Sequence, residues 1–333
     1  MPLPQTISET IDSYLRSVQG ARSEHTARTY RNALNAFCLT LQKHGVNPSQ
    51  LSPTALNEAA VSWFIADLHA GEPEYAASSE RLYLTAVTGF FEFLVVEGLE
   101  TIQLPRLRRI IRDRARRPGQ RLPQFPADSI ERLINDMINI INVVGDNTAE
   151  ERLRALRDRA LIVTLADTGL RIHEACKLTR GDVDWQECFA IVIGKGNRQD
   201  VVRFSARSMQ MLREYLRERS SLDGASGRSL RSLPLFARHD KGAGKKIKAI
   251  TPTTGRNIVA ERVGQFLGPE AVHTITPHSL RHYFVTRVLR GSGNLKLAQE
   301  LARHRNIAVT QRYAHLSNDE LDRGYYEIFE EGR

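Results

Sequence analysis

The sequence predicts a mainly helical protein of two domains, with a small antiparallel sheet in the second. Three observations predict this fold class. Apolar residues recur at helical spacing through the first hundred residues and again beyond residue 127. An arginine-rich stretch bracketed by prolines separates these two parts, and β-branched runs flank a Gly-Lys-Gly-Asn turn at 189–204. A chain of 333 residues with 41% hydrophobic content can bury more than one core.

Four apolar stripes predict four helices in the first part of the chain. Each stripe repeats every three or four residues, which places its members on one face of a helix. The stripes are Ile7, Ile11, Leu15 and Val18; Tyr30, Leu34, Phe37 and Leu41; Val61, Phe64, Ile65 and Leu68; and Leu82, Val87, Phe90 and Leu94. We expect these helices to form a compact domain over residues 1–104.

A basic stretch, PRLRRIIRDRARRPGQRLP, follows at 105–123 and holds eight arginines against one acid, Asp113. Runs of like charge are usually solvated. Lys and Arg together number 47 against 38 Asp and Glu, and the pI is about 9.7, so a polyanionic partner is indicated. Because it stands between two folded parts of a basic chain, the stretch is predicted to be a linker, 105–124, that lies along the phosphates of such a partner.

The remaining residues, 125–333, are predicted to form the second domain. Helices are expected at about 127–143 and 150–167, a β-hairpin at 189–204, and further helices toward the C-terminus. Residues 219–250 are rich in Ser, Gly and Lys, which predicts a mobile loop. In the tail, 317–333, Leu321, Tyr325 and Phe329 are four apart and predict a last helix.

Several classes of protein and site are disfavoured. The N-terminus has no signal-peptide pattern, and no stretch approaches the roughly 18 apolar residues of a membrane span, so we expect a cytoplasmic protein with no membrane partner. The three cysteines lack C-x-x-C spacing and indicate reduced thiols. KGAGKK at 241–246 is no phosphate loop, because Lys246 stands where Ser or Thr is needed and His239 where Gly is needed. No cofactor is predicted.

The stretch TPHSLRH at 276–282 is a candidate anion site. Thr276 is a good N-cap and Pro277 suits the first helical position, so His278 and Arg281 share one face near the positive end of the helix dipole. A pair of ordinary surface residues is the alternative. His278 and His282 also have the spacing of a zinc helix, but the glutamate of H-E-x-x-H is missing and Arg281 would repel a cation, so no metal site is predicted.

Other candidates are ambiguous when each is taken singly. Arg171 follows a Thr-Gly turn and has Glu174 three residues on, which can orient a guanidinium. Lys195 lies at the hairpin turn, where solvated lysines are common. Tyr313 follows His304 by nine positions and shares an apolar helical face with its neighbours, so it could simply pack.

Together these residues suit phosphodiester transesterification. Two guanidiniums can neutralise the charge of a pentavalent transition state. A histidine can take the proton of a tyrosine, whose reference pKa is near 10, and a lysine can protonate the leaving oxygen. Attack by the tyrosine would leave a covalent phosphotyrosine that keeps the bond energy for rejoining.

The motifs, in this order, resemble those of the tyrosine recombinases, the phage integrase family that includes the Xer proteins. They are T-G-L-R-x-x-E with Arg171 and Glu174, the G-K-G-N turn with Lys195, H-x-x-R with His278 and Arg281, and then His304 and Tyr313. SEHTARTYRNALNAF at 23–37 is similar to the family's core-binding domain. The resemblance implies an N-terminal helical core-binding (SAM-like) domain and a C-terminal mixed α/β catalytic domain, closing as a clamp on duplex DNA.

The resemblance also implies roles. Tyr313 would be the nucleophile, Arg171 and Arg281 would bind the scissile phosphate with support from His304, Lys195 would be the general acid and His278 the base. The implied partners are double-stranded DNA and further copies of the chain, as a tetramer on two DNA sites, or a partner recombinase. Residues expected to contact DNA are Arg28, Arg31, Arg108, Arg109, Arg112, Arg114, Arg116 and Arg117. Arg303 departs from the pattern, since a glycine usually precedes the histidine there.

Two alternatives stay open. A type IB topoisomerase uses similar residues but relaxes DNA as a monomer, and HTARTYRNAL at 25–34 and the tail after Tyr313 argue against it. An architectural DNA-binding protein would have no need of all six residues of the active site. The sequence leaves the target DNA site, and the choice between chromosome dimer resolution and mobile-element integration, undefined.

Overall fold

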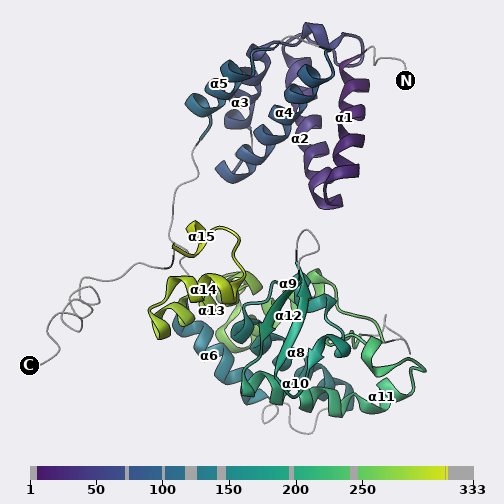
Figure 1. Cartoon of the computed structure of the whole chain (residues 1–333), viewed down its shortest axis with the longest axis vertical. Helices are drawn as coiled ribbons and strands as arrows, with labels where there is room; N and C mark the ends of the chain where they lie inside the picture. Colours follow the sequence, from purple (N-terminus) through teal and green to yellow (C-terminus); the bar gives the residue numbers. More distant parts are fainter. Residues whose placement is uncertain are drawn as a thin grey trace, which may run out of the picture. The chain divides into compact units, whose positions relative to one another are not determined.

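The computed structural model of the chain describes residues 6–71, 75–99, 102–116, 126–140, 148–194, 199–240, 247–311 and 313. The chain divides into two compact units, Met1–Gln120 and Arg121–Arg333 (Figure 1). In the part of the chain that the structure describes, no helix combines the length and the apolar character needed to cross a bilayer.

The first unit is a helical bundle with one core. Its α-helices are α1 (Ile7–Ala21), α2 (Glu24–Lys43), α3 (Glu58–Ala70), α4 (Ala77–Val96) and α5 (Leu104–Arg114), with the 3-10 helix η1 (Pro53–Ala55) between α2 and α3. The four predicted helices are confirmed, and their stripes fill the core. One stripe residue was wrong: Leu82 is 44% exposed, and Leu84, three positions before Val87, is buried in its place.

The basic stretch predicted to be a linker is, over its described part, a helix of the first unit. Helix α5 packs against α3 and α4, Leu107 is completely buried, and Ile110 and Ile111 pack on the same core. Just after α5, Arg116 Nε donates to the fully buried Glu80 Oε2 at 2.6 Å. The prediction was wrong because it weighed the arginine content above the apolar residues Leu107, Ile110 and Ile111. Their helical spacing lets the segment pack as a helix on the core of the first unit. Residues 117–124 of the expected linker lie outside the described residues.

The second unit surrounds one long buried helix, α8 (Ala149–Thr168), with α10 (Ala206–Glu218), α13 (Pro277–Ser292) and α6 (Ala127–Ile138) packed against it. Almost every residue of α8 from Leu153 onward is buried. The other described helices of the second unit are α9 (Ile172–Lys177), η2 (Arg180–Asp182), α11 (Ser220–Gly224), η3 (Leu230–Ser232), α12 (Pro252–Leu267), η5 (Pro269–Ala271), α14 (Leu295–Ala302) and α15 (Ile307–Gln311).

The predicted hairpin at 189–204 is confirmed. Strands β2 (Phe189–Ile193) and β3 (Gln199–Arg203) are antiparallel, with Phe189 opposite Arg203 and Ile193 opposite Gln199. A two-residue strand, β1 (Val183–Asp184), adds to the other side of β2, which gives the order β1-β2-β3. The turn residues 195–198, and with them Lys195, lie outside the described residues.

The mobile loop predicted at 219–250 is wrong for the residues that the structure describes there. Arg219 is completely buried and donates to the carbonyls of Pro234 (2.9 Å) and Leu235 (3.2 Å). Its Nε lies 2.8 Å from Asp223 Oδ1, and Leu235 and Phe236 are completely buried. A buried ion pair and a short apolar run anchor this segment, although its composition is typical of a loop. Residues 241–246 lie outside the described part.

Candidate active site

A tight turn at the end of α8 leads directly into the candidate site. Gly169 has φ +59°, a left-handed conformation, and a Cβ there would clash with the ring of Phe284. Only glycine meets both demands. The turn presents the Gly169 carbonyl to a guanidinium of α13 and places Arg171 directly at the start of α9.

Arg171 is partly exposed and is oriented by Glu174. Its Nη1 donates to Glu174 Oε1 at 2.8 Å, and its backbone N–H donates to Oε2 at 2.9 Å. The side chain of Arg171 is 41% exposed, whereas that of Glu174 is 4% exposed. The expected contact is therefore present, and it leaves part of the guanidinium available to a ligand.

Arg281 is buried at the same place. Thr276 caps α13 and accepts from Ser279 N at 3.2 Å, with Pro277 in the first turn as expected. The guanidinium of Arg281 donates to the carbonyls of Gly169 and Ala302. Burial and then the charges of Arg171 and Arg303 lower the pKa of Arg281 to about 9, so it is still protonated at neutral pH.

The two guanidiniums line one cavity of about 700 Å³ together with His278 and His304. His304 lies just after α14, and its Nδ1 is 2.9 Å from Thr310 Oγ1. Burial and the nearby arginines, Arg281 first, lower the pKa of His304 to about 4, so this imidazole is neutral at pH 7. Positive charge and neutral imidazoles in one hollow suit an oxyanion such as a phosphodiester.

Arg303 is a member of the site that the sequence pattern did not assign. Its Nη2 lies 3.0 Å from Glu174 Oε2, and the two side chains are 5% and 4% exposed. The backbone of Arg303 has φ 57°, the left-handed conformation that a glycine would favour. The only signal of this role in the sequence was that an arginine stands where a glycine usually precedes the histidine. In the structure that arginine is the second one, after Arg171, to form an ion pair with Glu174.

We expect Arg303→Met to destabilise the second unit by about 3 kcal/mol at pH 7, because Glu174 would lose its buried partner. Arg303→Gly removes the same ion pair but suits the left-handed backbone, so it should be about 1 kcal/mol more stable than the Met variant. Urea unfolding followed through Trp185 fluorescence, in a Trp63→Phe background, measures both. Equal stability of Arg303→Met and the parent would contradict this role.

The ion pair of Arg303 and Glu174 should also affect how the free energy of unfolding changes at acid pH. Burial acts to raise the pKa of Glu174, but Arg303 and Arg171 outweigh it and hold that pKa below its usual value. A carboxyl with a depressed folded pKa stabilises the fold above its unfolded pKa, and that stability is lost as the pH falls through the folded pKa. From about pH 5 to about pH 3, the parent should therefore lose more stability than Arg303→Met.

Tyr313 lies two positions after α15 and is hydrogen-bonded to a histidine. Its backbone N–H donates to Thr310 O at 3.0 Å, and its hydroxyl is hydrogen-bonded to Nδ1 of His282. The resemblance predicted His278 as the base, whereas the imidazole hydrogen-bonded to the Tyr313 hydroxyl is that of His282. His278 contacts His282 edge-on, with 4.1 Å between the ring centroids. Sequence reasoning considered His282 only as a metal ligand.

Not every predicted residue is at this site. Lys195 and Arg117 lie outside the described residues, as does the expected tail helix. Arg28 and Arg31 on α2, and Arg108, Arg109, Arg112, Arg114 and Arg116 in or just after α5, belong to the first unit. Among the residues that are described, no group of three or more His, Cys, Asp or Glu gathers as metal ligands would.

Comparison with known proteins identifies the family. Residues 128–320 match the phage integrase family, and residues 11–98 match the N-terminal SAM-like domain of phage integrases. The chain belongs to the phage integrase family. A tyrosine recombinase XerC of Mycobacterium sp. (strain KMS) is 30% identical over 326 residues, which cover 94% of this chain and 95% of that protein. Tyrosine recombinase XerC of Vibrio vulnificus (strain YJ016) is 29% identical, covering 96% and 90%.

Solved structures of a transposon integrase and of a site-specific recombinase share the fold. The Tn1549 transposon integrase in complex with transposon right end DNA superposes with a TM-score of 0.67 at 16% identity, covering 98% of this chain and 99% of that chain. The XerH recombinase bound to a palindromic difH substrate gives 0.66 at 19% identity, covering 98% and 85%. The predicted fold, and the prediction that the chain is a tyrosine recombinase, a DNA strand-transfer enzyme, are confirmed.

Proposed function

We propose that this protein is a site-specific recombinase that cuts one strand of duplex DNA with Tyr313 and stores the broken bond as a 3′-phosphotyrosyl link. One observation supports this most directly. The guanidiniums of Arg171 and Arg281 line a single cavity with two histidines, and the hydroxyl of Tyr313 is hydrogen-bonded to His282, on the same helix as Arg281. The cavity matches a phosphate, and the tyrosine supplies a nucleophile beside it.

Each residue has a role in this proposal. Arg171 and Arg281 grip the non-bridging oxygens of the scissile phosphate and neutralise the additional charge of the transition state. His304 adds a hydrogen bond to the same group. Glu174 holds Arg171, and Lys195, which the resemblance makes the general acid, protonates the departing 5′ oxygen. A histidine accepts the proton of Tyr313, after which rejoining needs no ATP.

The relatives support duplex DNA as the substrate. Two are named tyrosine recombinase XerC, and the XerH recombinase is bound to a difH substrate. We propose that four copies act on two DNA sites through a Holliday junction, each tail (317–333) packing on a neighbouring copy. The free thiols of Cys38, Cys176 and Cys188 are consistent with work in the reducing cytoplasm.

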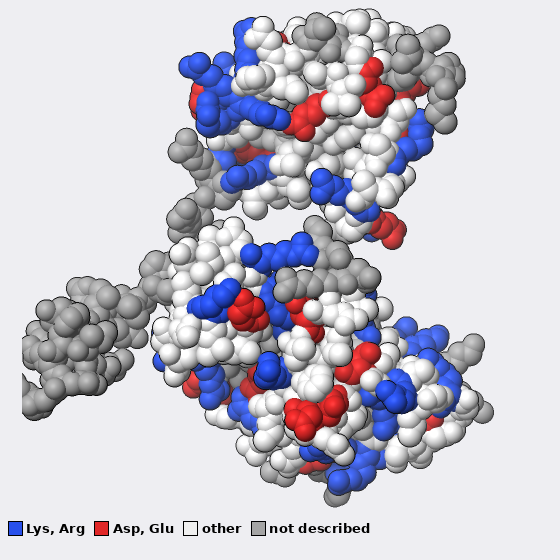
Figure 2. Space-filling view, viewed as in Figure 1, with Lys and Arg blue, Asp and Glu red and all other residues white. Residues whose placement is uncertain are grey.

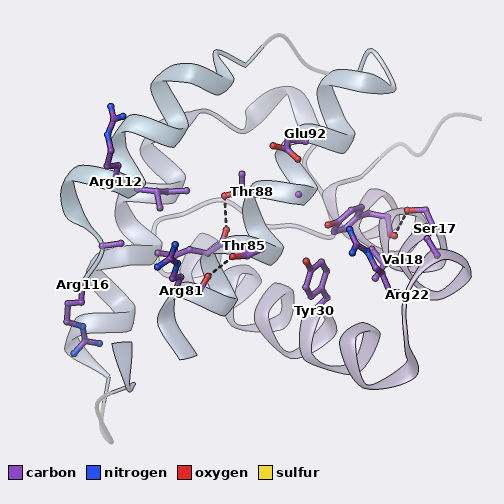
Figure 3. Close-up of a pocket in the computed structure, with 16 residues that line it drawn as sticks. Ser17, Val18, Arg22, Tyr30, Arg81, Thr85, Thr88, Glu92, Arg112 and Arg116 are labelled. Carbon is purple, nitrogen blue, oxygen red and sulfur yellow. Dashed lines mark hydrogen bonds between the residues drawn. The ribbon is translucent and has the colours of Figure 1, made fainter. Parts of the chain in front are cut away.

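The first unit offers a basic surface for DNA. Figure 2 shows Lys and Arg side chains gathered on the side of this unit where α5 lies. Arg22, Arg81 and Arg112 come from three elements around a cavity of about 840 Å³ (Figure 3). The hydroxyl of Tyr14, a residue 7% exposed, lines this cavity and has no hydrogen-bond partner in the described part of the chain. We propose that DNA phosphates lie across this cavity.

Because the basic stretch is a helix over its described part, its arginines point to different sides and cannot all contact the same DNA surface. Arg112 lines the cavity with Arg81, whereas Arg114 lines a different hollow with Trp63. Arg116 is held by Glu80 and the Tyr75 carbonyl, at 2.6 and 2.7 Å, so its main role is structural. Arg28, Arg31 and Arg109 are exposed and remain proposed DNA contacts.

We expect Arg112→Gln to lower the slope of log K against log salt for duplex binding by about 0.9, the value for one lost phosphate contact. Arg114→Gln removes the same charge from the other side of α5 and is the matched control. Fluorescence anisotropy of a labelled duplex at several salt concentrations measures both slopes. Equal slopes for Arg112→Gln and the parent would show that Arg112 contacts no phosphate and would contradict the proposal that DNA lies across this cavity.

Nicked suicide substrates test the function as a whole. The nick lets a short 5′ product diffuse away, so the covalent complex accumulates and is seen on denaturing gels. A tyrosine-linked DNA adduct and strand exchange between two sites are the expected results. Relaxation of supercoils without strand exchange would favour a topoisomerase, and binding with no adduct would favour an architectural protein.

A further inference from the structure

His282 contacts the proposed nucleophile of this site. The Tyr313 hydroxyl is hydrogen-bonded to its Nδ1, and the two rings are tilted with centroids 5.3 Å apart. The helical spacing of α13 places His278 one turn before His282, where the two rings meet edge-on. The histidine in contact with the reacting oxygen is thus the second of the pair.

We infer that His282 is a catalytic residue, which removes the proton of Tyr313 as the tyrosine attacks DNA and returns it when the strand is rejoined. The inference rests on the proposed function, because it assigns a base to the same reaction. It moves that role from His278, where the resemblance placed it. His278 then remains at the cavity wall, available to hydrogen-bond the phosphate.

The surroundings of His282 suit a base that works on a bound substrate. Among the described residues, the titratable and charged groups around it include His278, Arg281, His304 and Tyr313. Burial, followed by His278 and Arg281, lowers the pKa of His282 to about 4, so the imidazole is neutral at pH 7 and can accept a proton at Nδ1. A phosphate held by the arginines would add negative charge nearby and raise this pKa. Proton transfer from Tyr313 to His282 should therefore be easier with DNA in place than without it.

The bonds and protons balance. During cleavage the O–H bond of Tyr313 breaks and its proton moves to Nδ1 of His282. The tyrosine oxygen forms a bond to phosphorus, the bond from phosphorus to the 5′ oxygen breaks, and that oxygen takes a proton from Lys195. During rejoining the 5′ hydroxyl attacks, Lys195 regains its proton, and the imidazolium of His282 protonates the departing tyrosine.

His282→Asn is the sharpest test. The Asn side-chain oxygen can lie near the position of Nδ1 and accept a hydrogen bond, but it cannot hold the proton. Single-turnover cleavage of the suicide substrate at pH 7 should fall by about 10²–10⁴-fold, with duplex binding unchanged. Without a base the rate should rise about tenfold per pH unit above pH 7, since the tyrosine must ionise on its own. The parent should lack this rise. A parent-like rate and pH profile would overturn the inference.

Parallel variants separate the remaining explanations. A substrate with sulfur in place of the 5′ leaving oxygen needs no general acid, so it should restore Lys195→Ala but leave His282→Asn slow. If His278→Asn instead acquires the pH dependence and His282→Asn does not, the base is His278. Should His282→Asn lose its fold in a thermal melt, His282→Gln takes its place. If the parent forms no adduct at all, the proposed function fails, which is a different outcome from a parent that cleaves and an unaffected His282 variant.

Discussion

Tyr313→Phe is expected to bind its DNA site with the affinity of the parent and to form no covalent complex. The substitution removes one oxygen atom and keeps the ring, which packs against the ring of His282. The nucleophile is lost, so cleavage should fall below detection, a larger loss than for any other substitution considered. Quantitative anisotropy and suicide-substrate gels on the same preparation measure the two properties.

Tyr283→Phe provides the matched control. Tyr283 also lies in the second unit, and its hydroxyl contacts Arg287 and Glu131 rather than the cavity. Adduct formation should be retained in this variant. A persistent adduct in Tyr313→Phe would show that another tyrosine attacks the phosphate, and mapping the DNA-linked peptide would identify it.

Arg171→Ala and Arg281→Ala should each slow cleavage by about 10²–10³-fold, because one guanidinium cannot stabilise the transition state from both sides. Their effects on folding should differ. Arg171 is 41% exposed, so its removal should change the free energy of unfolding by less than about 1 kcal/mol. Arg281 is 3% exposed and bonds two carbonyls, so its removal should cost about 3 kcal/mol.

Lysine variants at both positions extend the test. Lysine keeps the charge but lacks the planar fork, so Arg281→Lys cannot donate to the Gly169 and Ala302 carbonyls while also facing a phosphate. Single-turnover rates and urea unfolding curves, measured for all four variants, give the two effects separately. A rate loss of less than tenfold in Arg171→Ala would contradict its place in the phosphate clamp.

The sequence could predict what depends on local spacing. The stripe Tyr30, Leu34, Phe37 and Leu41 is buried on α2 as predicted, apart from Tyr30, which is only partly buried, because its spacing alone fixes a helical face. The same reasoning failed for α5, where arginines outnumbered the apolar residues. It failed again at 219–240, where composition suggested a loop and the buried Arg219 could be recognised only through its tertiary partners.

The candidate site shows the same limit. The order of motifs predicted Arg171, Glu174, Arg281 and Tyr313, and the turn and cap that position two of them were visible in the sequence. Arg303 lies 129 positions from Glu174, and His282 lies 31 positions from Tyr313. No periodicity links residues at such separations, so these contacts could not be found before the chain was folded.

The two carbonyls that hold Arg281 have a consequence for the newly made chain. One comes from Gly169, 112 positions earlier, and the other from Ala302, 21 positions later. Contacts between such distant residues form slowly, because a long loop must close first. The guanidinium therefore gains its orientation only when the ends of α8 and α14 have met. An incompletely folded polypeptide leaving the ribosome would therefore lack the phosphate clamp that is proposed for this site.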